Sequence, residues 1–344
     1  MNLRFHYLPF IILAYCLLSS VAASPIHAQV VGIIDDASDD EFSYPFDDPG
    51  TPEDESIDGI IEDLLHRRTI RAAISEASGM NNGNGVPVNL NITATGTIVL
   101  TQGPLYPTDG SKIWSTSGIT IDASNTSTAI EFGARGTLDG VNFINGDFQV
   151  GVDSECTVRR CTFAFSRYNG LTVAGRWNII GGDRETEANS FFKMGQHGLH
   201  LVGDSNWVMG NYIGTDSFGT SLGNKFGIFI NGKGNTIGDL QEENGNVIAS
   251  NDRGISIAGD TTTGAKDNLI IGNYIGAVPR PFPDTIRFRG NQIGIELISA
   301  KNNQIGDLPP TDTSEHPENQ IYANTLQGIL VGYDAVGTDR KSVV

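Results

Sequence analysis

Residues 206–216 read NWVMGNYIGTD, and residues 268–278 read NLIIGNYIGAV. Both stretches contain an asparagine, apolar residues and then Gly-Asn-Tyr-Ile-Gly, and they begin 62 residues apart (268 − 206 = 62). Repetition of a short pattern over such a distance is typical of supersecondary units that stack on one another. The repeat therefore predicts a solenoid rather than a set of independent globular domains.

A second pattern consists of glycine, an apolar residue, any residue and another apolar residue. It occurs as GLTV, GLHL, GIFI, GISI, GIEL and GILV, starting at Gly170, Gly198, Gly227, Gly254, Gly294 and Gly328. Such a short strand cannot bury its apolar face alone, so it must stack on the equivalent strand of the next coil. We expect the glycine to supply a positive φ at a corner. Asparagines at the corners are expected to adopt left-handed conformations and to hydrogen-bond from coil to coil.

The N-terminal residues differ in composition from the repeats. Residues 1–28 combine Arg4 with an apolar run and small residues, which predicts a secretory signal peptide and hence a secreted or cell-surface protein. Residues 29–56 are acidic and contain three prolines, which predicts a disordered leader. The formal net charge of −18 argues against binding of nucleic acid and of anionic membranes, because both need clustered Lys and Arg.

Residues 57–117 are expected to contain a capping helix and the first strands. Apolar residues recur at helical spacing between Ile57 and Ala77, and Gly79 closes the pattern. Residues 118–344 are expected to form the coils. Because the sequence stops soon after GILV, we expect the series of coils to be truncated at the C-terminus.

Segments such as NTIGDLQEENGNVIASNDRGISIAG resemble the right-handed parallel β-helix repeats of the pectin-lyase-like superfamily. RTIRAAISEASG, followed by GTIVLTQGPLYP, resembles a CSLREA-type N-terminal module, although this chain lacks the cysteine that gives the module its name. The resemblance implies an all-β fold, a right-handed parallel β-helix solenoid with an N-terminal capping helix. It leaves the activity open, because many functions share this scaffold.

Sugar-cleaving members of that superfamily carry motifs that this chain does not reproduce. Arg280, Asp284 and Arg287, in RPFPDTIR, lack the spacing of the lyase motif, and only GQHGLH and IGTD approach the hydrolase motifs. We therefore assign no catalytic, cofactor-binding or metal-binding residue. His197 precedes a strand pattern and is interpreted as an unconstrained corner residue.

His200 is the outward-facing residue of GLHL. It is expected to share one column with Thr172, Phe229, Ser256, Glu296 and Leu330. A stripe of polar and aromatic side chains can bind a glycan, although a merely solvated sheet face is the plainer interpretation.

Three carboxylates follow the corner pattern Asn-x-Ile-Gly, namely Asp183, Asp239 and Asp307. Carboxylates are ligands for Ca²⁺. Two coil rises, about 10 Å, separate such residues and prevent them from sharing one ion. We favour capping of local turns by these side chains, with Ca²⁺ as the alternative.

Cys156 and Cys161 are the cysteines beyond the predicted signal peptide, and the pattern leaves open a disulfide or two free thiols. Asn91 and Asn125 begin NIT and NTS, which accept glycans only in a eukaryotic secretory pathway. We interpret the chain as a non-catalytic β-helix with a structural, adhesive or glycan-binding role, whose partner is an extracellular polysaccharide or a surface protein. The alternative is a polysaccharide lyase or glycoside hydrolase acting on uronate-rich polysaccharide.

Overall fold

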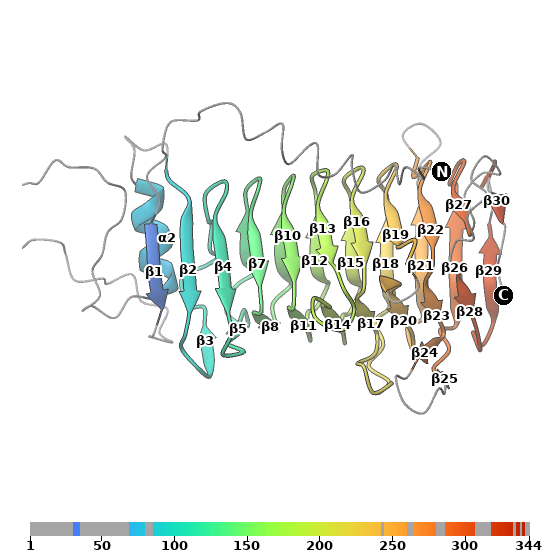
Figure 1. Ribbon diagram of the computed structural model, residues 1–344, viewed down its shortest axis with the longest axis horizontal. Helices are drawn as coiled ribbons and strands as arrows, with labels where there is room; N and C mark the ends of the chain where they lie inside the picture. Colours follow the sequence, from blue (N-terminus) through green and yellow to red (C-terminus); the bar gives the residue numbers. More distant parts are fainter. Residues whose placement is uncertain are drawn as a thin grey trace, which may run out of the picture.

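The computed structural model describes residues 30–34, 69–79, 85–241, 244–259, 264–279, 286–306, 318–332, 335–337 and 339–340. Within these ranges the chain winds into an elongated solenoid with three long parallel sheets, here called sheets A, B and C (Figure 1). The predicted signal peptide (1–28) lies outside the described residues, as do Arg280, Asp284 and Asp307.

Sheet A has eleven strands. In spatial order they are β1 (Val30–Ile34), β2 (Val88–Ile92), β4 (Lys112–Ser115), β7 (Thr137–Asp139), β10 (Thr157–Arg159), β13 (Ile179–Gly181), β16 (Trp207–Met209), β19 (Thr236–Gly238), β22 (Leu269–Ile271), β27 (Gln304–Ile305) and β30 (Asp339–Arg340).

Sheet B has nine strands, which are β3 (Thr97–Val99), β5 (Thr120–Asp122), β8 (Asn142–Ile144), β11 (Thr162–Ala164), β14 (Ser190–Phe192), β17 (Tyr212–Ile213), β20 (Val247–Ile248), β23 (Tyr274–Ile275) and β28 (Gln320–Ile321). Sheet C has eight, which are β6 (Thr128–Phe132), β9 (Phe148–Val152), β12 (Asn169–Val173), β15 (His197–Leu201), β18 (Phe226–Ile230), β21 (Arg253–Ala258), β26 (Ile293–Ile298) and β29 (Gln327–Val331).

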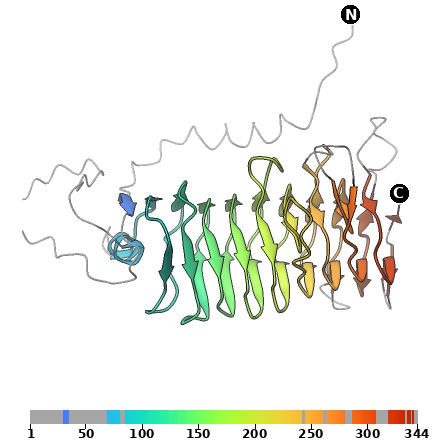
Figure 2. The ribbon, with the colours of Figure 1, turned by 90° about the horizontal axis from the view of Figure 1, so that it is seen from below.

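Most coils contribute one strand to each sheet. In the coil β10-β11-β12, for example, each strand pairs in parallel with its equivalents in the coils before and after it. Parallel connections of this kind are right-handed in nearly all proteins. The all-β right-handed parallel β-helix expected from the sequence is confirmed. Figure 2 shows the coils following one another along the long axis.

The core lies inside the coils, where the alternate residues of every strand meet. At its centre Phe143, Phe163 and Phe191, from β8, β11 and β14, form a stack with ring centroids 5.4 and 4.8 Å apart. Isoleucines such as Ile213 and Ile248 continue this column in sheet B. Burial of each such side chain contributes about 1.5–3 kcal/mol, so the stacking of coils supplies the burial that one strand cannot.

Three columns of asparagines run along the corners, and all of them except Asn324 are buried. The A ladder contains Asn178, Asn206, Asn235, Asn268 and Asn303, the B ladder Asn189, Asn211, Asn246, Asn273 and Asn319, and the C ladder Asn224, Asn251, Asn291 and Asn324. After the first member of each ladder, Oδ1 accepts hydrogen bonds from the backbone N–H and the Nδ2 of the asparagine one coil earlier, as Asn235 does from Asn206. The ladder expected from the sequence is confirmed.

The backbone conformation at these corners differs from the expectation. In the A ladder the positive φ belongs to the residue before each asparagine, as at Ser205 (57°) and Asp267 (57°), rather than to the asparagine itself. That residue turns the chain, and the asparagine that follows then points inward to satisfy polar groups at the bend.

The glycines of the strand pattern also have a different role from the one expected. Gly198 and Gly254 lie inside β15 and β21 and are absent from the residues with positive φ. A Cβ at Gly198 would lie 2.8 Å from the carbonyl oxygen of Gly227 in the next coil. These glycines therefore permit close approach of neighbouring coils.

A positive φ is found instead at the glycines that close the Asn-Tyr-Ile-Gly pattern. Gly214 has φ of 80° and Gly276 has φ of 88°. A Cβ at Gly214 would lie 2.2 Å from the carbonyl oxygen of Ala249 and 2.3 Å from Oδ1 of Asn251, a member of the C ladder. The glycine recurs in this pattern because the asparagine and the carbonyl oxygen of the next coil leave no room there for a side chain, as they also do at Gly276.

The N-terminal end of the solenoid carries the helix α2 (Ile70–Gly79) and the strand β1 (Figure 1). Oγ1 of Thr69 accepts a hydrogen bond from the N–H of Ala72 and caps the helix. Ile70, Ala73 and Ala77 are buried in the common core. The earlier part of the predicted helix, 57–68, lies outside the described residues.

β1 falls within residues 29–56, which were predicted to be disordered, and that prediction is wrong for residues 30–34. These five residues pair with β2 in parallel register, from Val30 with Val88 to Ile34 with Ile92. The sequence VVGII precedes the acidic run and carries no charge, so it can join the sheet. The composition of residues 29–56 as a whole is nevertheless acidic. The sheets also continue through residue 117 without interruption, since β2 and β4 belong to sheet A.

Candidate functional site

The outer face of sheet C presents the column predicted around His200. Thr172 pairs with His200, His200 with Phe229, Phe229 with Ser256, Ser256 with Glu296, and Glu296 with Leu330. Toward the N-terminus the column continues through Gly151 to Glu131. The predicted register is confirmed for every member of the column.

His197 is held in place, and the interpretation of it as an unconstrained corner residue is wrong. It is the first residue of β15, and its ring lies beside the column, 4.8 Å from the ring of His200 between centroids. Its ring stacks on Phe229 with centroids 4.6 Å apart and planes inclined by 8°. Its Nδ1–H donates to Oδ1 of Asn169 at 2.9 Å. His200 is fixed in the same way, because its Nε2–H donates to Oδ1 of Asn231 at 2.8 Å.

Both imidazoles are neutral near pH 7. Burial lowers the pKa of His197 to about 4, and the neighbouring His200 and Lys225 add to this effect. Burial also lowers the pKa of His200, although the hydrogen bond with Asn231 opposes that change. Neutral rings can stack with sugars or other rings, and each keeps one nitrogen that donates and one that accepts.

A hollow of ≈ 470 Å³ lies beside this cluster on the same face. Gly151 belongs to its lining, and the next strand carries Thr172 at the equivalent position. A Cβ at Gly151 would lie 2.2 Å from Oε2 of Glu131, so this carboxylate reaches across the glycine. The lining comprises Thr128, Glu131, Phe132, Phe148, Val150, Gly151, Val152, Asp153, Asn169, Thr172, Ala174, Gln196, His197, His200 and Val202.

The hollow has an acidic and aromatic character. Partial burial raises the pKa of Glu131, and Asp153 is the second carboxyl group in the lining. Neither Lys nor Arg belongs to that lining. Phe148 borders the hollow with 40% of its surface exposed and packs against Tyr168 at 5.3 Å between ring centroids.

Two basic side chains near the histidines are engaged with the aromatic cluster. Arg253 lies over the ring of Phe226 at 5.4 Å, and its Nε donates to Glu296 at 2.9 Å. Lys225 lies 5.8 Å from the centroid of the same ring. On the other side of the hollow Arg167 lies over the ring of Tyr168 at 5.2 Å.

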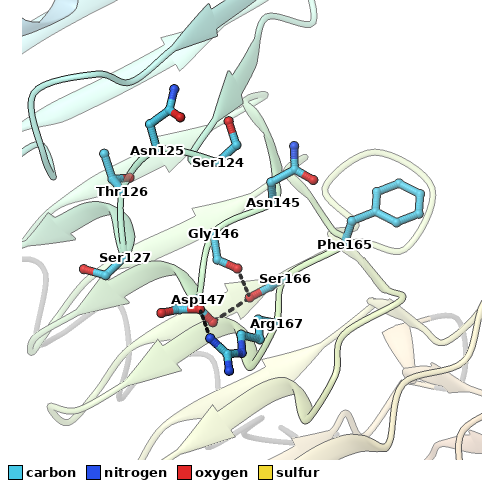
Figure 3. Close-up of a pocket in the computed structure, with 10 residues that line it drawn as sticks. All are labelled: Ser124, Asn125, Thr126, Ser127, Asn145, Gly146, Asp147, Phe165, Ser166 and Arg167. Carbon is cyan, nitrogen blue, oxygen red and sulfur yellow. Dashed lines mark hydrogen bonds and ion pairs between the residues drawn. The ribbon is translucent and has the colours of Figure 1, made fainter.

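A second hollow, of ≈ 660 Å³, lies at the corner between sheets B and C (Figure 3). Its lining is polar and is formed by Ser124, Asn125, Thr126, Ser127, Asn145, Gly146, Asp147, Phe165, Ser166 and Arg167. Arg167 and Asp147 form an exposed ion pair at 3.7 Å. Phe165 is the aromatic side chain in this lining and is 58% exposed.

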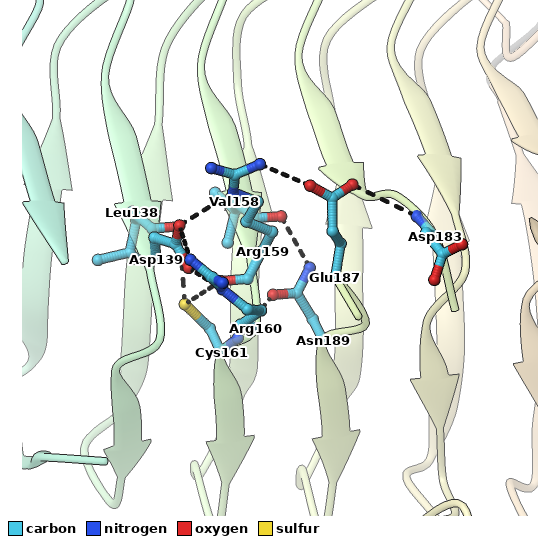
Figure 4. Close-up of polar contacts among 9 residues, drawn as sticks. All are labelled: Leu138, Asp139, Val158, Arg159, Arg160, Cys161, Asp183, Glu187 and Asn189. Atoms are coloured by element: carbon cyan, nitrogen blue, oxygen red, sulfur yellow. Dashed lines mark hydrogen bonds and ion pairs between the residues drawn. The ribbon is translucent and has the colours of Figure 1, made fainter. Parts of the chain in front are cut away.

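A cluster of charges on sheet A joins neighbouring coils (Figure 4). The buried carboxylate of Asp139 accepts hydrogen bonds from Nε of Arg159 at 3.0 Å and from Nε of Arg160 at 2.6 Å. Arg159 continues to Glu187 at 2.6 Å. Because every charge in this cluster has a partner of opposite sign, we interpret the cluster as structural.

The two predicted cysteines are free and buried, which resolves the alternatives left by the sequence. Each begins a ladder, since the N–H of Cys156 donates to Asn178 at 2.7 Å and that of Cys161 to Asn189 at 2.9 Å. Sγ of Cys156 accepts a hydrogen bond from the N–H of Gly136 at 3.3 Å. Sγ of Cys156 therefore accepts the hydrogen bond that Oδ1 of a ladder asparagine accepts in later coils.

Asp183 and Asp239, two of the three carboxylates considered for Ca²⁺, accept hydrogen bonds in local turns. Oδ1 of Asp183 accepts hydrogen bonds from the N–H groups of Glu185 and Thr186, at 2.9 and 3.0 Å. Asp239 accepts from the N–H of Leu240 at 2.7 Å. Among the described residues, no group of three or more His, Cys, Asp or Glu side chains is placed to hold a metal ion.

Arg287, from the Pro-rich segment, has a structural contact. It lies in β25 (Ile286–Phe288), which forms an antiparallel hairpin with β24 (Ala277–Pro279). Its guanidinium donates to the carbonyl oxygen of Phe218 at 2.8 Å, and Arg289 donates to that of Gly219 at 2.8 Å. These contacts tie the hairpin to the loop after β17.

The sequence missed the hollow and Glu131. The signal that could have found them is Gly151, a glycine at the outward position of a strand whose neighbours carry side chains there. Within the part of the chain that the structure describes, no helix is long and apolar enough to cross a membrane.

Comparison with known proteins shows likeness in structure but not in sequence. No family model matches the chain. No curated protein matches it either. The crystal structure of the Dettilon tailspike protein (gp208) is similar at 15% identity with a TM-score of 0.45, covering 78% of this chain and 57% of that one. The pectate lyase Pel9A is similar at 13% identity with a TM-score of 0.46, covering 93% of this chain and 80% of that one.

This chain thus spans 57% of the length of the tailspike chain. At these identities the likeness concerns the fold alone, and no residue of either protein is transferred to this chain.

Proposed function

We propose that the outer face of sheet C binds a glycan and that the protein acts as a binding β-helix. The observation that carries this proposal is the hollow at Gly151, which places aromatic rings next to hydrogen-bonding groups. A sugar ring has an apolar face of C–H groups and a rim of hydroxyls. Phe148 offers a surface for such a face, while Thr172, His197 and Glu131 offer partners for hydroxyls.

The glycan of this proposal is neutral. Glu131 and Asp153 line the hollow, the histidines carry no charge near pH 7, and no basic side chain enters the lining. Like charges close together in a partly buried site repel strongly. A uronate polymer would bring further carboxylates to this surface, so it is disfavoured relative to an uncharged polysaccharide.

Binding can be measured by affinity electrophoresis and calorimetry with neutral polysaccharides, such as glucans, xylans and mannans, and with polygalacturonate. The decisive variant is Gly151→Thr, which fills the hollow with the residue that the next strand already carries. Its Cβ displaces only the mobile end of Glu131, so the fold is expected to remain intact. Ile179→Thr, an exposed position on sheet A paired with Thr157, is the matched control.

Retention of a neutral polysaccharide that is lost in Gly151→Thr and kept in Ile179→Thr supports the proposal. Retention that is equal in all three proteins contradicts it, because the bound polymer would then contact another surface. Stronger retention of polygalacturonate than of every neutral polymer would overturn the assignment to uncharged glycans.

Hydrolysis is a second candidate function, favoured by one observation. A glycosidase needs a protonated carboxylic acid and a second carboxylate, and partial burial raises the pKa of Glu131 in a hollow that also contains Asp153. In that case new reducing ends appear with the wild type and disappear in Glu131→Gln, while binding persists. Binding without turnover in the wild type excludes this candidate for the polysaccharides tested.

Secretion belongs to the same proposal. Residues 1–28 have the composition of a signal peptide, and an extracellular location would bring sheet C into contact with polysaccharide. Fractionation of cells that express the full chain, with N-terminal sequencing of the product, tests it. Recovery of uncleaved protein inside the cell contradicts it.

A further inference from the structure

Two corner positions carry residues that the backbone conformation does not favour. Phe165 has φ of 61° and Trp177 has φ of 60°. A positive φ is unusual for any residue other than glycine, and for a bulky side chain it is a genuine outlier. Such outliers persist where the surrounding structure imposes them, and they concentrate at functional sites.

The columns to which these residues belong show what the corners otherwise accept. The column of Phe165, between sheets B and C, has Asn145, Lys193, Ser250 and Ala323 at positive φ in other coils. The column of Trp177, between sheets C and A, has Arg135, Glu155, Ser205, Gly234, Asp267, Asn302 and Gly337. The conformation is common to the corners, whereas the large aromatic side chains are specific to one coil.

Burial does not account for these aromatic residues. Phe165 is 58% exposed and Trp177 is 55% exposed. Phe165 meets Phe192 in an edge-to-face arrangement at 6.2 Å, and Arg176 covers one side of Trp177 at 5.1 Å. Both rings therefore keep substantial surface in solvent, where a large apolar group in a strained conformation gives no stability.

The two rings stand at opposite ends of the same strand. Phe165 precedes β12 and Trp177 follows it, so they occupy the two corners that flank sheet C in this coil. The hollow at Gly151 opens between these corners, beside Asn169 and Thr172 of β12. At the first end the corner hollow offers hydroxyl and amide groups next to Phe165 (Figure 3). An aromatic ring beside such groups suits a sugar for the same reasons as the central hollow does.

We propose that the bound glycan runs along β12, across the axis of the solenoid, with one sugar stacked on Phe165 in the corner hollow and another on Trp177 at the far corner. This inference rests on the proposed function of sheet C. It adds the direction in which the glycan lies and two outer subsites for its sugars. The alternative path, along the column of His200 and parallel to the solenoid axis, touches neither ring.

The test uses the variants Phe165→Asn and Trp177→Asn. Asparagine already occupies both columns, as Asn145 and Asn302, and it tolerates the left-handed conformation. We expect the unfolding midpoint of each variant to equal or exceed that of the wild type. Lys193→Asn and Ser205→Asn, at the same corners one coil further along, are the matched controls.

Affinity is measured on an array of neutral gluco-, xylo- and manno-oligosaccharides graded from disaccharides to decasaccharides. For chains long enough to span β12 we expect each aromatic variant to bind about tenfold more weakly, the loss of one stacked ring. Disaccharides, which fill only the central hollow, should bind wild type and variants alike. The two control variants should bind as the wild type does at every length.

The outcomes separate this inference from the function on which it rests. If Gly151→Thr abolishes binding while Phe165→Asn and Trp177→Asn bind long chains normally, the path along β12 is wrong and glycan binding on sheet C stands. If Gly151→Thr has no effect, the proposed function fails first. Phe165→Asn and Trp177→Asn could also weaken the binding of disaccharides as much as that of long chains. Both rings would then contact the sugar in the central hollow, and the assignment of two outer subsites would be wrong.

Discussion

Nδ2 of Asn206 donates a hydrogen bond to Oδ1 of Asn235, one coil further along, at a distance of 3.0 Å. The same Nδ2 donates to the carbonyl oxygen of Gly175 at 3.1 Å, and Oδ1 of Asn206 accepts from the backbone N–H and the side chain of Asn178. One buried amide thus satisfies polar groups of three successive coils.

Replacing Asn206 by alanine is expected to lower the free energy of unfolding by about 3 kcal/mol or more, because several buried polar groups lose their partners at once. Urea denaturation followed by circular dichroism measures the change. Asn125→Ala, at an exposed bend, is the control and is expected to stay within about 0.5 kcal/mol of the wild type. Equal effects of the two substitutions would show that the ladder does not stabilise the coils.

The two roles of glycine can be separated by a pair of substitutions. Gly214→Ala places a Cβ 2.2 Å from the carbonyl oxygen of Ala249 at a φ of 80°, so it combines backbone strain with overpacking. We expect it to cost about 2–5 kcal/mol. Gly103→Ala has a similar φ of 88° but nothing within 4 Å, and we expect only the strain of about 1–2 kcal/mol.

Thermal and urea unfolding of both glycine variants measures this difference. Should Gly103→Ala be as destabilising as Gly214→Ala, the backbone conformation alone would account for the glycine at residue 214, and close packing against the ladder would have no measurable role.

Both thiols are expected to be inert in the folded protein. Burial raises the pKa of Cys161 to about 12 and that of Cys156 to about 11, and the thiolate is the reactive form. Protein lacking residues 1–28 should therefore show no reaction with a thiol-specific disulfide reagent at pH 8. In urea both thiols should be modified, and rapid modification under native conditions would contradict the burial of the first ladder positions.

The protein should become less stable as the pH falls, because His197 is protonated in the unfolded state at a higher pH than in the folded state. The folded pKa is about 4 against an ordinary value of 6.5, so below 6.5 the unfolded state binds a proton that the folded state rejects. The free energy of unfolding should decrease from pH 6.5 to about 4.

His197→Gln removes this titration while keeping a polar residue that Gln327 already provides in the same column. The difference in unfolding free energy between wild type and His197→Gln is expected to change with pH across that range and to be constant above it. A difference that is independent of pH would mean that His197 titrates alike in the folded and unfolded states.

Repetition made the fold predictable. Equivalent residues of successive coils must pair, so counting from each Gly-apolar-x-apolar pattern places His200 beside Phe229, as the structure confirms. The buried ladders followed from the same register, because Asn at a corner recurs only if the residue one coil away can satisfy it.

Features that depend on the depth and curvature of the surface could not be predicted in this way. Alternation assigns Gly151 to the outer face but does not say that Glu131 bends across it. The sequence pattern does not show that His197 is held in place. The pattern GLHL begins at Gly198, whereas β15 begins one residue earlier, at His197. β1 was missed because five apolar residues have little weight in a long acidic segment.

The ladders start only at Cys156, Cys161 and Met194, the last of which donates its N–H to Asn224 at 2.9 Å. The earlier coils therefore have corners of another kind, with buried apolar residues such as Ile119 and Val141 where asparagines stand later. The terminal unit of an array has a neighbour on one side only, and therefore needs a cap. α2 and β1 stand at this end of the solenoid, so its open edge is covered by a helix and a strand beyond the coils that carry asparagine ladders.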